Sequence, residues 1–300
     1  MTKIAANGIE LEYEDSGDKS APVMLLVHGL GAQLSLWPTK FIDGLVQAGF
    51  RVVRYDNRDI GLSTKFESYG VPNLGQLVQQ AMAGQKIPAP YYLKDMAQDG
   101  IALLDALHIK QAHVVGVSMG GMIVQTMAIE HPSRVLSMTS IMSTSGRRGL
   151  PQGKPEAMQA LMSVPPSTDR DTLIAHNMKL RRIIGSPGYP SDEAELRALV
   201  TRNVDRSYYP QGVARQYNAV MASGGRVNTL PTIKTPSLII HGADDPLLPL
   251  AAGEDTAKLI PGSQLKVYPG MGHDLPTALV PDLVATIANH ARAAATKAAA

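Results

Sequence analysis

Short, nearly uninterrupted runs of apolar residues limit the fold of this 300-residue chain more than any other feature. Val23–Val27, His113–Val117 and Ser237–Ile240 each have the pattern of a strand that is buried on both faces. Apolar residues at helical spacing fill stretches between such runs, among them 91–107 and 119–130. Buried strands that alternate with helices are typical of a parallel sheet covered on both sides. We therefore expect an α/β fold with a mostly parallel central sheet flanked by helices.

Local patterns outside these runs predict further strands and helices. Asn7-Gly8 is a strong two-residue hairpin signal, because both turn positions favour positive φ, and it predicts strands over 3–6 and 9–13. Further elements expected from the pattern are a helix over 39–48, strands over 50–55 and 264–268, and a last helix from about residue 281 into an Ala-rich tail.

The alternation of strand and helix stops at Ser145-Gly-Arg-Arg-Gly149, and from there to Arg226 the pattern is that of helices separated by Pro and Gly. We therefore predict a core formed by 1–145 and 227–300 and a helical cap, or lid, formed by 146–226. Basic residues gather in this insertion, with 12 Lys and Arg against 7 Asp and Glu between 147 and 226. A solvated basic face is the favoured interpretation, and a preference for anionic substrates or membranes is the alternative.

Charge and cysteine content exclude several classes of protein. A formal net charge of +2 gives no indication of nucleic-acid binding. Because the chain has no cysteine, it can form no disulfide, no thiolate nucleophile and no zinc–thiolate site. No apolar run approaches the roughly 20 residues that span a bilayer, and the first residues lack the apolar segment of a secretory signal. We expect a cytoplasmic, soluble protein that is a monomer or a small homo-oligomer.

Metal and cofactor signatures are also missing from the sequence. No His-Glu-x-x-His motif occurs, so we expect no metal site. The glycines of 116–121 lack both the Lys-Ser/Thr ending of a phosphate-binding loop and the spacing of a dinucleotide fingerprint. We therefore expect chemistry that needs no cofactor.

The sharpest motif is Gly116-Val117-Ser118-Met119-Gly120, which lies between an apolar strand and a helix. This is Gly-x-Ser-x-Gly in the strand–turn–helix context that the motif requires. A serine on such a tight turn exposes its hydroxyl, and the start of the helix directs free N–H groups toward an oxyanion formed there. Ser118 is therefore the candidate nucleophile.

A serine hydroxyl needs a base to become a good nucleophile. His273 follows the last expected strand in a glycine-rich loop, Pro269-Gly-Met-Gly-His273, which can bring an imidazole to the nucleophile. His28 and His241 also follow strands, but each precedes a glycine, and hydrogen bonding within the loop is their expected role. His273 is the candidate base.

The acid that orients this base is expected in the loop after the preceding strand, His241-Gly-Ala-Asp-Asp245. Asp245, which immediately precedes Pro246, is favoured over its neighbour Asp244, and Asp274 is a poor candidate because it adjoins the base. The chain order of serine, aspartate and histidine is that of α/β-hydrolases and differs from the chymotrypsin and subtilisin orders.

Five segments in this order resemble the α/β-hydrolase superfamily, and the likeness extends from about residue 4 to 290. The segments are HGLG at 28–31, DNRDIGLS at 56–63, GVSMG at 116–120, HGADD at 241–245 and GMGH at 270–273. Within the superfamily the chain is similar to bacterial carboxylesterases and to the aclacinomycin methylesterase-like group. The resemblance implies an oxyanion hole formed by the backbone N–H groups of Leu30 and Met119, and a structural role for the loop 56–63.

Four residues are candidates for the wall of a substrate pocket. Trp37, the only tryptophan, either borders the acyl pocket or belongs to the core. Leu247 and Leu248 follow the candidate acid, and Met142 follows an earlier strand. Methionines of the insertion are expected to line or pack the lid.

These features predict a serine carboxylic-ester hydrolase that acts on small- to medium-chain esters through a Ser-His-Asp triad and an acyl-enzyme. Its expected partner is a small-molecule ester. A carbon–carbon bond hydrolase and a cofactor-free perhydrolase would use the same residues and are the alternatives. A ligand receptor that retains the fold is a less favoured class. Dehalogenase and epoxide hydrolase chemistry are disfavoured, because both need an Asp where this chain has Ser118.

Overall fold

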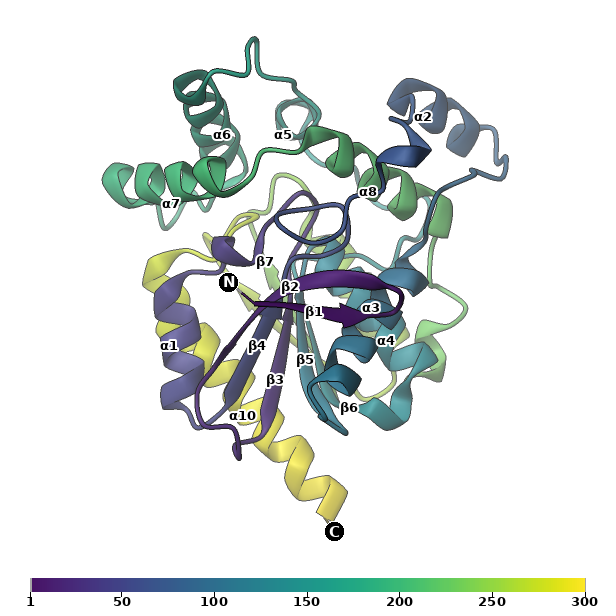
Figure 1. Cartoon of the computed structure of the whole chain (residues 1–300). Coiled ribbons are helices and arrows are strands. Elements are labelled where there is room, and N and C mark those ends of the chain that lie inside the picture. Colours follow the sequence, from purple (N-terminus) through teal and green to yellow (C-terminus); the bar gives the residue numbers. More distant parts are fainter. Residues whose placement is uncertain (1, 300) are drawn as a thin grey trace.

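An eight-stranded sheet forms the centre of the computed structural model, which describes residues 2–299 (Figure 1). The strands lie in the order β1-β2-β4-β3-β5-β6-β7-β8. Their bounds are β1 Thr2–Ala6, β2 Ile9–Ser16, β3 Val23–Val27, β4 Arg51–Tyr55, β5 Ala112–Val117, β6 Val135–Ile141, β7 Ser237–Gly242 and β8 Gln264–Tyr268. Strand β2 runs antiparallel to both β1 and β4, and the strands from β4 to β8 pair in parallel. The predicted mostly parallel sheet is confirmed.

Seven of the eight strands form where the sequence patterns predicted them, and β6 is the strand before Met142 for which no bounds were predicted. Every residue of β3, β5 and β7 is buried, as expected for central strands covered on both faces. Asn7 and Gly8 adopt φ values of 51° and 74° and join β1 to β2, so the predicted hairpin is present. The parallel strands bring their carboxyl ends to one edge of the sheet, which is where ligands bind in open α/β sheets.

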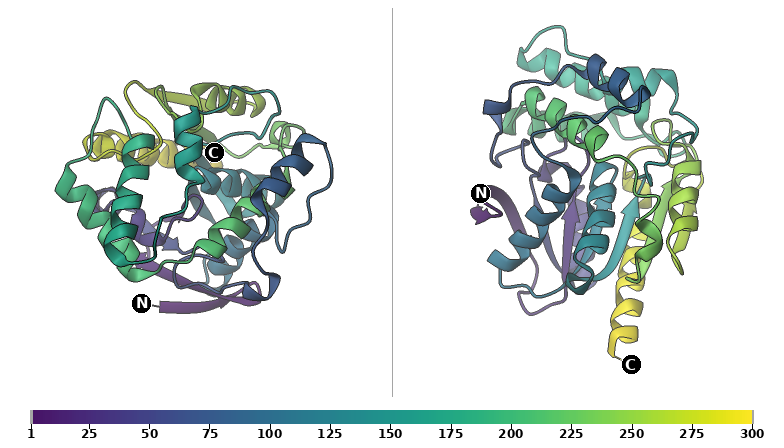
Figure 2. Two further views of the ribbon diagram at one scale, coloured as in Figure 1. Left: turned by 90° about the horizontal axis from the view of Figure 1, so that it is seen from above. Right: turned by 90° about the vertical axis from the view of Figure 1, so that its right-hand side faces the viewer.

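Helices cover both faces of the sheet (Figure 2). The bounds are α1 Thr39–Gln47, α2 Leu74–Met82, α3 Leu93–Ala106, α4 Met119–Glu130, α5 Pro155–Leu161, α6 Arg170–Ile184, α7 Glu193–Arg206, α8 Pro210–Ser223, α9 Leu250–Leu259 and α10 Val280–Ala299. Helices α1 and α10 share one apolar core with the sheet, and α3, α4 and α9 share the other. Helix α4 is buried on nearly every side, which fits its almost wholly apolar sequence.

A helical insertion, α5 to α8, separates β6 from β7 and lies beyond the carboxyl edge of the sheet (Figure 1). Helices α6 and α7 pack around a small apolar cluster of their own, formed by Ile174, Met178, Leu196 and Val200. The expected helical character of this stretch is therefore present. The division into a core and a cap with limits at 146 and 226 stays a prediction.

The loop after β4 joins the insertion to the sheet. Asp56 accepts hydrogen bonds from the backbone N–H of Leu34 and from Nη1 of Arg206, both at 2.7 Å. Asp59 holds Arg215 of α8 by two hydrogen bonds of 2.8 Å. These contacts agree with a structural role for this loop, and they fix α7 and α8 above the site.

Candidate active site

Ser118 lies on the sharp turn between β5 and α4 and adopts φ 56° and ψ −119°, a backbone conformation that non-glycine residues rarely adopt. Glycines make the turn sterically feasible. A Cβ on Gly116 would lie 2.1 Å from the carbonyl oxygen of Gly120, and a Cβ on Gly120 would lie 2.0 Å from the carbonyl oxygen of Val27. The turn therefore depends on glycine at both positions and exposes the serine side chain at the carboxyl edge of the sheet.

Three predicted site residues meet at this edge, each from a different loop. His273 Nε2 lies 3.0 Å from Ser118 Oγ, and His273 Nδ1 lies 2.7 Å from Asp245 Oδ2. These distances are those of a serine–base–acid hydrogen-bond chain. Ser118 follows β5, Asp245 follows β7 and His273 follows β8, so the parallel sheet brings together residues 155 positions apart.

Asp245 is buried, and its surroundings favour the carboxylate. Its Oδ1 accepts hydrogen bonds from the backbone N–H groups of Leu247 and Leu248, each at 2.9 Å. Burial acts to raise the pKa of Asp245, but the charge and hydrogen bond of His273 and the Leu248 amide outweigh it and lower that pKa. An ionised Asp245 accepts the Nδ1–H of His273 and leaves Nε2 free to accept a proton from Ser118.

The rejected acids have other partners. Asp244 accepts a 2.7 Å hydrogen bond from the backbone N–H of Gly270, at the start of the histidine loop. Asp274 accepts a hydrogen bond from the hydroxyl of Ser186, in the loop after α6. The structure thus brings Asp245, and neither of its competitors, into hydrogen-bond contact with His273.

The two other histidines that follow strands take part in loop contacts, as expected. His241 is fully buried, and its Nε2–H donates to the carbonyl of Leu248 at 2.8 Å. His28 Nδ1 accepts from the N–H of Gly29 at 2.8 Å. Burial, together with the positive charge of Arg181, lowers the pKa of His28 to about 3, so its ring stays neutral at ordinary pH.

The turn that carries Leu30 lies directly against the serine. A Cβ on Gly29 would lie 3.1 Å from Cβ of Ser118 and 3.6 Å from its Oγ. Leu30 and Met119 border the same cavity as Ser118. Their backbone N–H groups belong to the two turns that meet at Ser118, and the oxyanion hole that the resemblance implies stays a prediction.

Side chains that the sequence analysis did not single out hold this turn. Asn57 Nδ2 donates to the carbonyl of His28 at 3.0 Å, and Gln216 Oε1 accepts from the N–H of Gly31 at 2.9 Å. Asn57 belongs to the segment 56–63 that resembles the family, so a signal for it existed. Gln216 lies on α8, and no sequence pattern distinguishes it from other polar helix residues.

A cavity of about 570 Å³ lies between the carboxyl edge of the sheet and the helical insertion, and Ser118 and His273 border it. Of the residues expected in a pocket wall, Met142, Leu247 and Leu248 line it. The cavity lies in the size range of small-molecule sites.

Trp37 does not line this cavity, whose described lining residues include its neighbours Leu36 and Pro38 instead. Its side chain is fully buried, stacks on Phe41 with ring centres 5.5 Å apart, and packs against His28 at 4.8 Å. The expectation that Trp37 borders the acyl pocket is therefore wrong, and the alternative, that it belongs to the core, is correct.

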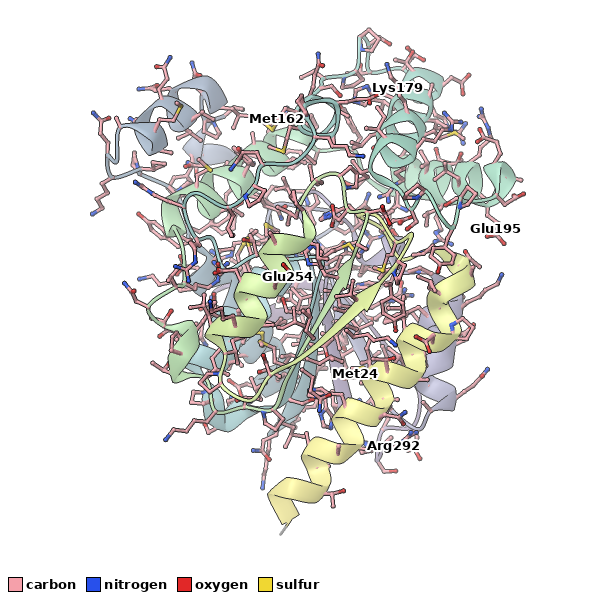
Figure 3. All side chains as sticks on the ribbon, turned by 180° about the vertical axis from the view of Figure 1, so that it is seen from behind. Met24, Met162, Lys179, Glu195, Glu254 and Arg292 are labelled. Carbon is pink, nitrogen blue, oxygen red and sulfur yellow. The ribbon has the colours of Figure 1, made fainter. Side chains whose placement is uncertain are left out.

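The methionines of the insertion divide by position. Met158 lines the cavity, while Met178 is buried in the core of the insertion. Met162 is 37% exposed and lies at the end of the molecule away from Arg292 (Figure 3). The insertion therefore contributes one of these three side chains to the cavity wall.

Within residues 2–299, the side chains of His, Asp and Glu form no group of three that could ligate a metal ion. Over the same described residues, no helix is both long enough and apolar enough to span a bilayer.

Comparison with known proteins places the chain in a family. A sequence model described as alpha/beta hydrolase fold matches residues 22–276. The chain is 28% identical over 312 residues to the rhodomycin D methylesterase DauP of a Streptomyces strain, covering 97% of this chain and 98% of DauP. It is 27% identical over 267 residues to 3-oxoadipate enol-lactonase 2 of Acinetobacter baylyi, covering 88% of this chain and 86% of the relative. The structure of the esterase EaEST from Exiguobacterium antarcticum matches with a TM-score of 0.74 at 22% identity, over 97% of this chain and 99% of that one.

A mostly parallel sheet with a hydrogen-bonded serine–histidine–aspartate chain at its carboxyl edge is typical of hydrolytic enzymes of the α/β class. The family match covers most of the sequence, and this chain belongs to the α/β-hydrolase fold family. The predicted fold and the predicted class of enzyme are confirmed.

Proposed function

We propose that this enzyme hydrolyses carboxylic esters of small to medium chain length, with Ser118 as nucleophile, His273 as base and Asp245 as the acid that orients it. The observation that carries the proposal is the continuous chain of contacts from Ser118 Oγ to His273 Nε2, at 3.0 Å, and from His273 Nδ1 to Asp245 Oδ2, at 2.7 Å. Such a chain activates a serine hydroxyl that is otherwise a weak nucleophile.

In the first half-reaction, His273 Nε2 takes the hydroxyl proton of Ser118 as Oγ attacks the ester carbonyl carbon. The carbonyl oxygen becomes an oxyanion, which the backbone N–H groups of Leu30 and Met119 stabilise. Asp245 stabilises the protonated imidazole through Nδ1–H. The imidazolium then gives its proton to the departing alkoxide, the C–O bond breaks, and an alcohol leaves behind an acyl-enzyme on Ser118.

In the second half-reaction, water takes the place of the alcohol. His273 removes a proton from the water as its oxygen attacks the acyl carbonyl, and the same two amides hold the second oxyanion. The proton then passes from the imidazole to Ser118 Oγ as the acyl bond to the enzyme breaks. A carboxylic acid is released and the free serine is restored.

The cavity supports the proposed range of substrate size. Its volume of about 570 Å³ suits a small organic ester, and leucines from both the core and the insertion border it. We assign the segment 146–226 the role of a lid, since α5, α6, α7 and α8 each contribute lining residues above Ser118. Its side chains would select the acyl and alcohol groups that fit.

The relatives support ester chemistry in a general way. Rhodomycin D methylesterase is named for the cleavage of a methyl ester, and 3-oxoadipate enol-lactonase for the opening of a lactone, which is a cyclic ester. Both reactions proceed by attack on an ester carbonyl. At identities of 27–28%, these names support cleavage of an ester bond by this chain. Which ester it cleaves depends on the residues of its own pocket.

The test is hydrolysis of p-nitrophenyl esters with acyl chains from acetate to palmitate, with the unaltered protein beside Ser118→Ala. We expect turnover that peaks at short or medium chains and depends on Ser118. A structurally matched control is Ser143→Ala, which removes the hydroxyl that donates to the Ser118 carbonyl at 2.8 Å and leaves the triad intact. Absence of Ser118-dependent turnover on every chain length would contradict the proposal.

A further inference from the structure

Arg181 brings a positive charge into the cavity from the last turn of α6. Leu180 and Ile184 of the same helix also line the cavity. Lys179, two residues earlier in the same helix, is exposed to solvent; it is labelled in Figure 3. Residues two apart on a helix point about 200° apart, which agrees with an outward Lys179 and an inward Arg181.

Within residues 2–299, Arg181 makes no side-chain hydrogen bond and has no carboxylate within ion-pair distance. Burial lowers the pKa of its guanidinium, and the charge of Asp274 opposes that effect without reaching contact. Arginine remains protonated at such sites, because its delocalised guanidinium holds its proton far above neutral pH. Arg181 is therefore a partly buried cation whose donors lack a partner in the protein.

The other charged side chains of the cavity lining differ in this respect. Lys40 and Glu195 form an ion pair of 3.5 Å at the exposed margin. Arg202 donates to the carbonyl of Ser35 at 2.8 Å and is exposed. Asp274 is held by the Ser186 hydroxyl. Among the described residues of the lining, Arg181 is the one charged side chain that forms neither a hydrogen bond nor an ion pair with the protein.

The end of α6 is bonded to the loop of the candidate base, so the position of Arg181 is fixed relative to Ser118. The backbone N–H of His273 donates to the carbonyl of Ile184 at 2.7 Å, and the N–H of Gly272 donates to Oγ of Ser186 at 2.9 Å. Arg181 lies one turn before these contacts. Its charge also acts on His28, beside the nucleophile, and helps to keep that ring neutral.

We propose that Arg181 binds a carboxylate carried by the substrate, so that the preferred ester is one with a free acid group. A guanidinium presents a planar pair of donors that matches a carboxylate, and a single cation balances a single negative charge. The largely apolar surroundings increase the strength of this contact, because fewer water molecules compete for it. The inference rests on the proposed function, since the anion is part of an ester held beside Ser118.

Binding is tested first, without turnover. Isothermal titration calorimetry with glutarate, a simple dicarboxylate, measures recognition of the anion by the full-length protein. We expect Arg181→Gln to weaken glutarate binding by about ten- to a hundredfold, because the variant loses the charge-assisted hydrogen bonds to the carboxylate. Arg181→Lys should retain part of the affinity. The matched control is Arg182→Gln, the next residue of α6, which is exposed, forms an ion pair with Glu193, and should leave binding unchanged.

Turnover is tested with paired esters that differ only in charge. p-Nitrophenyl hydrogen glutarate places the anion on the acyl side, and its methyl ester is the neutral partner. 4-Carboxyphenyl butyrate and phenyl butyrate form the corresponding pair on the alcohol side. We expect Arg181→Gln to lower kcat/KM for at least one anionic ester by about tenfold or more, mainly through KM, and to change the neutral partner by less than about twofold.

The outcomes separate this inference from the proposed function. Equal losses on charged and neutral esters, or glutarate binding that is unchanged in Arg181→Gln, would overturn the role of Arg181 while ester hydrolysis still stands. Resistance of both the charged and the neutral esters to hydrolysis would overturn the proposed function, and Arg181-dependent binding of glutarate would still support an anion site. Stronger binding of inorganic phosphate than of glutarate would overturn the assignment to a carboxylate.

Discussion

Arg215 and Asp59 form a two-pronged ion pair at the junction between the helical insertion and the sheet. Nε of Arg215 lies 2.8 Å from Oδ2 of Asp59, and Nη2 lies 2.8 Å from Oδ1. Both residues are essentially excluded from solvent, and Tyr91 donates a further hydrogen bond of 2.7 Å to Asp59. The orientation of α8, and with it the contact of Gln216 with the turn at Gly31, depends on this pair.

Replacement of Arg215 by Met should leave the Asp59 carboxylate buried without its cation. We expect the free energy of unfolding in urea to fall by about 3–5 kcal/mol, because breaking one side of a buried pair strands the other charge. The double variant with Asp59→Asn should recover part of the loss. Arg170→Met, which removes an exposed pair with Asp205, should have little effect. Equal losses of unfolding free energy in Arg215→Met and Arg170→Met would contradict a larger contribution from the buried pair.

Asp245→Asn should lower kcat for ester hydrolysis by about 10³- to 10⁴-fold, because an amide that donates to His273 would favour the wrong tautomer of the imidazole. Asp244→Asn is the matched control. This neighbouring carboxylate bonds the N–H of Gly270 instead of the imidazole, and its loss should cost less than about tenfold, the factor that corresponds to a single modest hydrogen bond. Larger losses in Asp244→Asn than in Asp245→Asn would reverse the assignment of the acid.

Gly120→Ala should destabilise or unfold the protein. The added Cβ would lie 2.0 Å from the carbonyl oxygen of Val27, a backbone atom that cannot move without shifting β3. Thermal unfolding measures the effect, and we expect a loss of several kcal/mol, about 3 or more. Gly75→Ala in α2 is the control, since its Cβ would approach nothing closer than 3.4 Å. That change should be neutral or slightly stabilising, because alanine favours a helix.

The sequence was most informative where local chemistry and sheet topology act together. Helix α4 begins at Met119 and ends at Glu130 as predicted, because the glycine turn precedes it and Pro132 follows its end. Ser118, Asp245 and His273 could each be placed at a strand end, and parallel strands bring such ends to one edge. The hydrogen bonds between them are long-range contacts that follow from the topology.

Features that depend on packing between distant segments could not be predicted. Trp37 was a candidate for the pocket wall, but its burial against Phe41 and His28 depends on how α1 packs on the sheet. Arg181 and Arg182 are adjacent and look alike in sequence, yet one faces the cavity and the other pairs with Glu193. Only the orientation of α6 in the folded protein determines which of the two arginines faces the cavity.

His113 should make stability depend on pH. Burial, with the charge of His290, lowers its pKa from 6.5 to about 4, so the ring stays neutral in the folded protein. Between about pH 6.5 and pH 4 the unfolded chain binds a proton that the folded chain does not, and the free energy of unfolding therefore falls as the pH is lowered. This residue contributes up to about 3 kcal/mol of that change.

Urea unfolding of His113→Asn at several pH values measures this contribution. The variant should show a shallower fall in unfolding free energy over the window from pH 6.5 to pH 4. The control is His108→Asn, an exposed residue with a φ of 57° that asparagine tolerates. An identical slope in the unaltered protein and in His113→Asn would contradict the assignment.

The central claim is that Ser118 becomes covalently acylated during turnover, and covalent labelling tests it most directly. A p-nitrophenyl alkylphosphonate should react once per chain, release p-nitrophenol and leave the phosphonyl group on Ser118, as read by intact-protein and peptide mass spectrometry. The account predicts one adduct on the peptide that contains Ser118, no adduct in Ser118→Ala, and much slower labelling in His273→Ala. An adduct on another residue, or ester turnover by a protein whose Ser118 cannot be labelled, would contradict it.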